Sequence, residues 1–469
     1  MFSRTGLAAP PGNQGSLMPI SGRHALVIGG SMAGLCAARA LSERFDRVTL
    51  VERDVFGGPD PRKGVPQGRH LHALLRRGLD ELEGWFPGLN AELQGLGAEE
   101  MEFGTDLRWF HYGGWKVGAP SGVVCLGLSR PLLEHAVRQR VLALPNLDRQ
   151  DGVVVRGLLT DPARRRVTGV RVTKDGVESE IAADLVVDTS GRGSALPRWL
   201  AELGRDAVPE SVLTVNVGYA SRVWRRPPAG TVAWKGCYVL GQSPHSKRLG
   251  AIFPVEGGRW ISVLAGVLGD HPPIDEEGHA RFARELPHPA IADALARAEP
   301  LSDIASYRFP AHQRRHYERA SMPDGLVAVG DAVCSFNPIY GQGITTAALG
   351  ARALEAHLAT DGGGEGASDR FQRRLSGVLD VPWMMSTGED LRYPEVEAVR
   401  PWYNGIAQWY TARVHRAALH DPEVARAFYQ AMNLVAPPTV LAGVAWRVLM
   451  GGGERPAAPQ LTQQELATK

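Results

Sequence analysis

The chain has 469 residues, of which 44% are hydrophobic and 22% charged, and this composition is ordinary for a soluble globular protein of two or three domains. Its 52 basic and 50 acidic residues nearly balance, and they are interspersed along the chain. That pattern argues against nucleic-acid binding and favours small organic partners. Four widely separated cysteines without metal-ligand spacing predict reduced thiols, with no disulfide and no structural metal, in a cytoplasmic protein.

The two ends of the chain predict no folded structure. Residues 1–22 mix Pro, Gly and polar residues without periodicity and are expected to form a flexible tail, as are residues 451–469. The first stretch lacks the charged start and apolar core of a secretory signal. No run of about eighteen apolar residues occurs anywhere, so the sequence predicts no membrane span.

A strand–turn–helix–strand pattern opens the first folded region. The apolar run Ala25–Ile28 has the length of a buried parallel strand, and a second run, Val48–Val51, ends on Glu52. This order predicts a dinucleotide-binding turn, in which a helix N-terminus faces a pyrophosphate and the acid binds a ribose hydroxyl. The candidate residues of the turn are Gly29, Ser31, Met32, Ala33 and Gly34.

One position of this turn departs from the usual pattern. Ser31 stands where a second glycine normally lets the backbone approach the pyrophosphate. A serine is small and its hydroxyl is able to donate to phosphate, so we expect the site to be altered rather than lost. The alternative is a parallel-sheet turn without a ligand.

Residues 60–77 form a basic, turn-rich stretch before a helix. Arg62, Lys63 and Arg69 are candidates to contact the pyrophosphate, and the alternative is a solvated basic loop. His70 and His72 are two residues apart and would share a helical face poorly. Whether either histidine assists catalysis stays open.

The middle of the chain predicts a helix and then mostly strands. Residues 129–142 have a capping Ser129 and helical spacing, and Arg130 at the mouth of the helix is a candidate phosphate contact. Three β-rich runs, 153–159, 167–173 and 180–187, predict an antiparallel ribbon over the nucleotide domain. Long alternating strands from about 208 to 268 then predict a second, sheet-based domain, and 276–300 is expected to be helical.

A second glycine-rich stretch lies about three hundred residues after the first. Residues 326–329 predict a buried strand, Asp331 follows it, and a loop with Gly341 and Gly343 leads into an Ala-rich helix. We expect Asp331 to accept from a sugar-like hydroxyl and the backbone amides of 341–344 to favour an electron-rich ligand edge.

The pair GGSMAG…VERD and GDAVCSFNPIYGQG resembles the flavin monooxygenases of the para-hydroxybenzoate hydroxylase fold. RKGVPQGRH and DTSGRGS look like the actinobacterial polyether-type epoxidases of natural-product and antibiotic biosynthesis. The resemblance runs from about residue 24 to 354 and implies an FAD cofactor. By this resemblance, Glu52 binds the adenosine ribose, Arg53, Arg62 and Arg130 lie along FAD with Lys63 beside them, and Asp331 holds the ribityl chain. The residues implied to cradle the isoalloxazine lie within 338–344, namely Pro338, Gly341, Gln342, Gly343 and Ile344.

The same resemblance implies an oxidoreductase. NADPH or NADH reduces the flavin, O2 is captured as a C4a-hydroperoxide, and one oxygen atom passes to a small hydrophobic substrate, with epoxidation of an alkene favoured. Ser190 stands where aromatic hydroxylases carry Asp before Gly191, which weakens the alternative of ring hydroxylation. An isoprenoid-type flavin reductase is the other alternative, and a separate flavin reductase is a candidate partner because no second dinucleotide fold is visible. No catalytic acid or base is assigned.

The sequence therefore predicts an α/β protein with a Rossmann-like FAD-binding domain (23–205 and 301–360), an inserted mixed or antiparallel β-sheet substrate domain (206–300) and a C-terminal helical cap (370–450). The stretch 361–369 reads as a flexible linker. In the cap, Trp383, Met384, Met385, Trp402, Trp409 and Tyr410 are expected in the core. Glu389 and Asp390 are expected on the surface, although a part in catalysis stays open.

Overall fold

A five-stranded parallel sheet forms the centre of the nucleotide-binding half of the molecule. The structure is a computed structural model that describes residues 23–62, 64, 66–361 and 364–451; the expected tail 1–22 and residues 452–469 lie outside the described residues. In sheet order, the strands are β18 (Leu326–Ala328), β11 (Leu185–Asp188), β1 (His24–Ile28), β2 (Arg47–Glu52) and β7 (Leu147–Asp151). The middle strands are almost wholly apolar and buried, as expected of a sheet with helices on both faces.

Helices pack around this sheet. They are α1 (Met32–Ser42), α2 (Arg76–Trp85), α3 (Leu89–Gly95), α4 (Arg130–Leu142), α5 (Leu196–Glu202), α8 (Gly343–Asp361) and α9 (Ala367–Asp390). The hydroxyl of Ser129 accepts from the backbone N–H of Leu132 (3.3 Å), so the predicted cap of α4 is confirmed. The stretch 361–369, read as a linker, is divided between the end of α8 and the start of α9, and residues 362 and 363 lie outside the described part. The first half of α9 packs Phe371, Leu375 and Leu379 into the core of the parallel sheet rather than into a separate cap.

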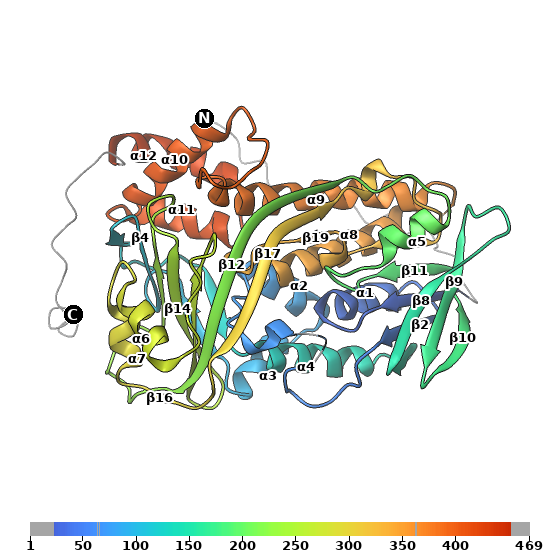
Figure 1. Ribbon diagram of the computed structural model, residues 1–469, viewed down its shortest axis with the longest axis horizontal. Coiled ribbons are helices and arrows are strands. Elements are labelled where there is room, and N and C mark those ends of the chain that lie inside the picture. The colour runs from blue at the N-terminus through green and yellow to red at the C-terminus, as the bar shows by residue number, and fades with distance from the viewer. Residues whose placement is uncertain (1–22, 63, 65, 362–363, 452–469) are drawn as a thin grey trace, which may run out of the picture.

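A nine-stranded, mainly antiparallel sheet forms the second half. Its strands are β4 (Leu107–His111), β5 (Gly114–Trp115), β12 (Glu210–Arg225), β13 (Gly236–Leu240), β14 (Arg248–Val255), β15 (Arg259–Gly266), β16 (Glu299–Pro300), β17 (Ala305–Arg315) and β19 (Cys334–Ser335). Figure 1 shows β12 and β17 running side by side through the middle of the molecule and linking its two halves. Because β4 and β17 pair within this sheet, it extends beyond the range 206–300 expected from the sequence.

The predicted antiparallel ribbon is present with one correction. It contains β8 (Val153–Thr160), β9 (Val167–Lys174) and β10 (Val177–Ala182), while a small sheet pairs β3 (Glu99–Glu102) with β6 (Val124–Gly127). The third run, expected as one strand over 180–187, divides after Ala182. The backbone N–H of Asp184 donates to the carbonyl of His24 (2.8 Å), which directs the rest of the run into the parallel sheet as β11.

Helices pack on the nine-stranded sheet and form the cap. They are α6 (Glu276–Arg284), α7 (Ala290–Leu295), α10 (Asn404–Ala417), α11 (Pro422–Met432) and α12 (Ala445–Gly451), with a 3-10 turn η5 (Pro438–Val444). Several apolar side chains expected in the core are instead exposed: Trp402 is 89% exposed, Trp409 51% and Met384 41%. None of the helices in the described ranges is both long enough and apolar enough to cross a membrane.

Candidate functional site

A cleft of about 490 Å³ lies at the carboxyl ends of the parallel strands, where open α/β sheets bind ligands. It joins the two glycine-rich stretches that are far apart in the sequence. Most of the predicted site residues line it: Gly29, Ser31, Met32, Ala33, Glu52, Arg53, Arg130, Asp331, Pro338, Gly341, Gln342, Gly343 and Ile344. Gly34 and Arg62 stand behind the wall of the cleft, and Lys63 lies outside the described residues.

The first turn is built for close backbone packing. A Cβ on Gly34 would lie 1.7 Å from the carbonyl oxygen of Gly29, so a side chain cannot be accommodated there without moving the turn. Gly29 has a φ of +103°, a conformation that favours glycine. The first N–H groups of α1 have no acceptor within the helix. They end at the cleft, as an anion-binding helix terminus requires.

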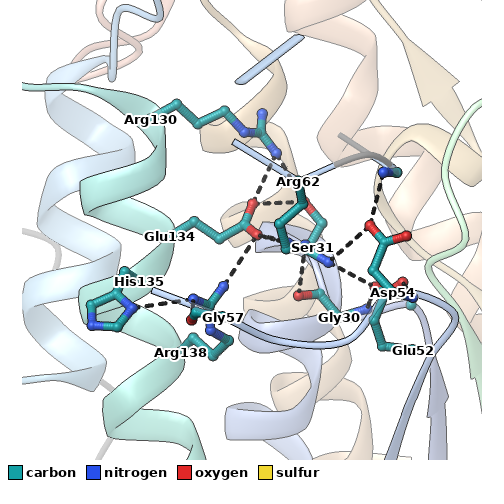
Figure 2. A network of polar contacts seen from close by, with 12 residues as sticks. Gly30, Ser31, Glu52, Asp54, Gly57, Arg62, Arg130, Glu134, His135 and Arg138 are labelled. Carbon is teal, nitrogen blue, oxygen red and sulfur yellow. Dashed lines mark hydrogen bonds and ion pairs between the residues drawn. The ribbon is translucent and has the colours of Figure 1, made fainter. Parts of the chain in front are cut away.

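A buried carboxylate, Glu134 of α4, organises the charges beside this turn (Figure 2). Arg62 donates to its Oε1 through Nε (2.9 Å) and a terminal nitrogen (2.5 Å). Arg130 donates to its Oε2 (3.3 Å), and Arg138 forms an ion pair with it at 3.6 Å. Burial alone would raise the pKa of Glu134, but the charges of Arg130 and Arg62 lower it below its usual value.

Ser31 is tied into the same cluster. Its hydroxyl accepts from Arg130 (2.8 Å) and donates to Glu134 (3.1 Å), as Figure 2 shows. The serine that replaces the usual glycine thus connects the turn to the arginines. Arg62, expected along the cofactor, does not line the cleft. Its guanidinium forms ion pairs with Glu134 (2.5 Å) and Glu52 (3.4 Å).

Glu52, at the end of β2, is fixed by two backbone hydrogen bonds. Glu52 accepts from the backbone N–H of Gly30 (2.7 Å) and of Asp54 (2.9 Å), and its side chain faces the cleft. A carboxylate has further lone pairs, so it remains able to accept from a ribose hydroxyl. The position agrees with the part predicted for Glu52, which stays a prediction.

The second stretch forms the opposite end of the cleft. Asp331 follows β18 in a 3-10 turn, η3 (Gly330–Ala332), and makes no hydrogen bond or ion pair with any described residue. Burial raises the pKa of its carboxyl, while Arg130 and Arg192 act in the opposite direction. The turn η4 (Pro338–Tyr340) follows, and α8 begins at Gly343 with its free N–H groups at the cleft.

The donors and acceptors of this cleft fit FAD. Nε of Arg130 is buried without a partner, and the carboxylate of Asp331 is likewise unpartnered among the described residues. One end therefore offers a cation and helix amides for a pyrophosphate, and the other offers an acceptor for a ribityl hydroxyl. The amides at the start of α8 suit the electron-rich edge of an isoalloxazine.

A buried hydrogen-bond network supports the second end. Asp390 accepts from His312 Nε2 (2.6 Å), from the side-chain amide of Asn337 (3.2 Å) and from the hydroxyl of Tyr340 (2.7 Å). Tyr219 in turn donates to the side-chain oxygen of Asn337 (2.8 Å). The surface location expected for Asp390 is therefore wrong, since Asp390 is 2% exposed, whereas the side chain of Glu389 is 24% exposed in its ion pair with Arg392.

A second, smaller cavity of about 40 Å³ adjoins the cleft at the end lined by Pro338. The two share Gln67, His72, Ala73, Tyr307 and Pro338 in their walls. The small cavity continues over the inner face of the nine-stranded sheet, where Tyr219, Tyr238, Leu249, Ala251 and Val263 line it.

Two histidines separate the cleft from this cavity. The turn η1 (Pro66–Arg69) ends just before them. His70 contacts the hydroxyl of Ser221 (2.8 Å), and His72 donates from Nδ1 to the carbonyl of His70 (2.9 Å). Burial, with a nearby arginine in each case, lowers the pKa of His70 to about 4 and of His72 to about 3. Both rings are therefore neutral at pH 7.

Some residues of the wall were not singled out from the sequence. Tyr307 and Phe309 come from β17, whose alternating pattern gives no sign of facing a ligand. Asn337 lies within the second motif, but its importance is visible only from its partners in space. The stretch Thr189–Gly193 also lines the cleft.

Comparison with known proteins identifies the family of this chain. A family model described as FAD binding domain matches residues 23–385. Protein Rv3254 of Mycobacterium tuberculosis is 34% identical over 435 residues, which are 88% of this chain and 90% of that protein. Kynurenine 3-monooxygenase of Salinispora arenicola is 27% identical over 398 residues, 78% of this chain and 80% of its own. The p-nitrophenol 4-monooxygenase of Pseudomonas putida shares the fold, with a TM-score of 0.58 and 16% identity over 92% of this chain and 99% of that chain.

Proposed function

Because this chain belongs to the family of FAD-dependent monooxygenases and hydroxylases that share this FAD-binding domain, we propose that it transfers one oxygen atom from O2 to a small, neutral, hydrophobic natural-product intermediate. Epoxidation of an alkene is the favoured reaction. Hydroxylation of an electron-rich ring is the second candidate, supported by the names of the relatives Kynurenine 3-monooxygenase and p-nitrophenol 4-monooxygenase.

The observation that carries the proposal is the uncharged wall of the smaller cavity. Its described lining holds no acid, lysine or arginine: Gln67, His70, Leu71, His72, Ala73, Tyr219, Tyr238, Leu249, Ala251, Val263, Tyr307, Pro338 and Ile339. The lowered pKa values keep both histidines neutral. A substrate carboxylate or ammonium would be buried there without a partner, at a cost of several kcal/mol.

The protein's part in the reaction is to position and to exclude water. A bound reduced flavin supplies the activation of O2 and the electrophilic oxygen. Arg130 and the amides of α1 would hold the pyrophosphate, Glu52 the ribose, Asp331 the ribityl chain and the start of α8 the ring edge. The apolar wall formed by Leu249 and Val263 would keep water from the reacting atoms.

The source of electrons is part of the proposal. NADPH or NADH would reduce the flavin directly, as is typical of the family, or a partner flavin reductase would supply the electrons. The cavity of about 40 Å³ is too small for a drug-sized molecule alone, so the substrate would also occupy the adjoining end of the cleft.

The experiment is product analysis under 18O2. The FAD-loaded protein is supplied with NADPH or NADH, with and without an added flavin reductase, and tested with neutral alkenes, neutral phenols and carboxylated analogues of each. We expect one labelled oxygen in a neutral alkene product and no turnover of the carboxylated analogues. A product that gains two hydrogens and no label would identify an isoprenoid-type reductase, and labelled phenols alone would identify a ring hydroxylase.

A further inference from the structure

Large apolar side chains are exposed on the outer face of the cap. Trp402 is 89% exposed, Ile406 65% and Trp409 51%, and Trp446 and Met450 on α12 are 63% and 78% exposed. Together with Val399 and Leu449, these residues form a surface that we call the cap face. Exposed apolar residues scattered singly are normal, but a group with three tryptophans needs an explanation.

The cap face is continuous across two helices. Ile406 and Trp409 lie three residues apart on α10, and Trp402 lies in the turn just before this helix. The guanidinium of Arg413 lies over the ring of Trp409 (4.9 Å to the centroid) and donates to the carbonyl of Leu449 (3.4 Å). Figure 1 shows α10 and α12 together at one corner of the molecule.

The second half of α10 is a normal core segment. Val414 and Ala417 are buried in the same cluster as Tyr238 of the small cavity. The exposed apolar side chains lie in the first half of the helix, where core packing does not require them. Apart from Arg413 over Trp409, no described residue covers Ile406 and Trp409, which stay 65% and 51% exposed.

The charge of these segments has one sign. Residues 398–420 and 434–451 contain Arg400, Arg413, Arg416 and Arg447 and no acid, although the whole chain has 52 basic and 50 acidic residues. Arg447 is paired with Asp421 of α11 (3.0 Å). Arg400 and Arg413 donate to backbone carbonyls, and neither forms an ion pair with an acid among the described residues.

We propose that the cap face docks on an anionic lipid bilayer, with α10 and α12 lying in the plane of the headgroups. Tryptophan prefers the interface between water and hydrocarbon, and arginines beside it match anionic headgroups. A second protein surface would be expected to offer acids to these arginines. Residues 452–469, GGERPAAPQLTQQELATK, contain two acids and two bases and only two large apolar residues, too few to cover three tryptophans.

The docking surface does not depend on the proposed reaction, because binding to lipid needs neither flavin nor turnover. One consequence does rest on the proposed function: a neutral apolar substrate dissolved in the bilayer would be held next to the helix whose second half packs in the same cluster as Tyr238 of the small cavity.

The test is co-sedimentation of the full chain, loaded with FAD, with vesicles of phosphatidylglycerol and phosphatidylcholine or of phosphatidylcholine alone. We expect binding to the anionic vesicles, and quenching of tryptophan fluorescence when bromine-labelled lipids are used. Replacing three tryptophans together (Trp402→Ser, Trp409→Ser, Trp446→Ser) should reduce partitioning by at least about tenfold. Arg413→Gln should reduce it roughly fivefold on anionic vesicles, since each surface cation contributes about that factor.

The matched control is Val177→Ser, an apolar residue 68% exposed on β10, the strand that Figure 1 shows at the end of the molecule away from α10 and α12. It should bind vesicles like the unaltered protein. Flavin absorbance and circular dichroism should be unchanged in all variants, because the altered side chains are largely exposed. Absence of vesicle binding, or equal binding by the triple tryptophan variant, overturns the proposal. A dimer that the triple variant loses, without any vesicle binding, would assign the cap face to a second copy of the chain and also overturn it.

Discussion

Asp390 accepts a hydrogen bond of 2.6 Å from Nε2 of His312, and both side chains are buried. The backbone N–H of Asn337 donates to Nδ1 of the same ring (3.2 Å), which places the ring proton on Nε2. The pair therefore holds the start of the loop that leads through Pro338 to α8. Through this loop, Asp390 at the end of α9 positions the first backbone amides of α8, which lie at the cleft.

The first prediction is that Asp390→Asn weakens FAD binding. The new amide group would face at least one of the donors that now reach the carboxylate, and each unpaired buried donor costs about 1–3 kcal/mol. We expect the dissociation constant of FAD to rise by about tenfold or more, measured by fluorescence titration of the apoprotein. Asp380→Asn is the control, because Asp380 lies on the same helix but is 65% exposed in its ion pair with Arg314. Equal effects of the two substitutions would contradict the positioning part of Asp390.

The Rossmann-like half could be predicted from the sequence because its features are local. The strand, glycine turn, helix and acid from 24 to 52 lie within one continuous stretch, and steric limits at Gly34 leave few alternatives. The same holds for the capped helix α4, whose signals are all within its first turn.

The Asp390 network could not be predicted, since His312, Asn337 and Asp390 come from separate parts of the chain and each alone resembles an ordinary polar residue. The opposite error occurred at Trp402 and Trp409, which were expected in the core because apolar residues on a helix are usually buried. Periodicity identifies an apolar face but not what covers it. The edges of the second sheet were also missed, because β4 and β17 pair with strands far away in the sequence.

A second prediction concerns Gly34→Ala. The added Cβ would lie 1.7 Å from the carbonyl oxygen of Gly29 and 2.9 Å from the hydroxyl of Thr189, so β1 and α1 would have to separate. We expect a loss of about 3 kcal/mol or more in the free energy of unfolding, together with loss of bound flavin on purification. Gly377→Ala in α9 serves as control, because a Cβ there meets no atom within 4 Å. Stable, yellow Gly34→Ala protein would show that the turn is looser than this geometry requires.

The third prediction is a pH effect from His72. Burial is the main cause that lowers its pKa to about 3, with the charge of Arg130 adding to it, whereas the unfolded chain has a histidine pKa of about 6.5. Between these values the unfolded chain binds one more proton, so stability falls as the pH decreases below 6.5. The contribution from pH 7 to pH 5 is about 2 kcal/mol. His72→Gln should therefore lose less stability over this interval, measured by urea unfolding of the apoprotein at both pH values. An identical loss in the two proteins would contradict a neutral His72 with a lowered pKa.

The last prediction separates binding from folding at Asp331. Its carboxyl lines the cleft without a partner within the described residues, and partial burial raises its pKa, so we expect the ionised group to destabilise the folded apoprotein at pH 7. Asp331→Asn should make the apoprotein more stable at pH 7 while weakening FAD binding, since an amide is a poorer acceptor for a ribityl hydroxyl than a carboxylate. Asp331→Ala should also stabilise the apoprotein but raise the dissociation constant of FAD by about tenfold to a hundredfold, because buried hydroxyls are left unpaired.

The pH dependence of stability in the unaltered protein follows from the raised pKa of Asp331. The contribution of this group to the free energy of unfolding is present at low pH and is lost as the pH rises through the folded-state pKa. Urea unfolding of the apoproteins at pH 4 and pH 7, paired with FAD titrations, measures both quantities. A less stable apoprotein in both variants would mean that Asp331 is a structural residue and that the ribityl end of FAD lies elsewhere in the cleft.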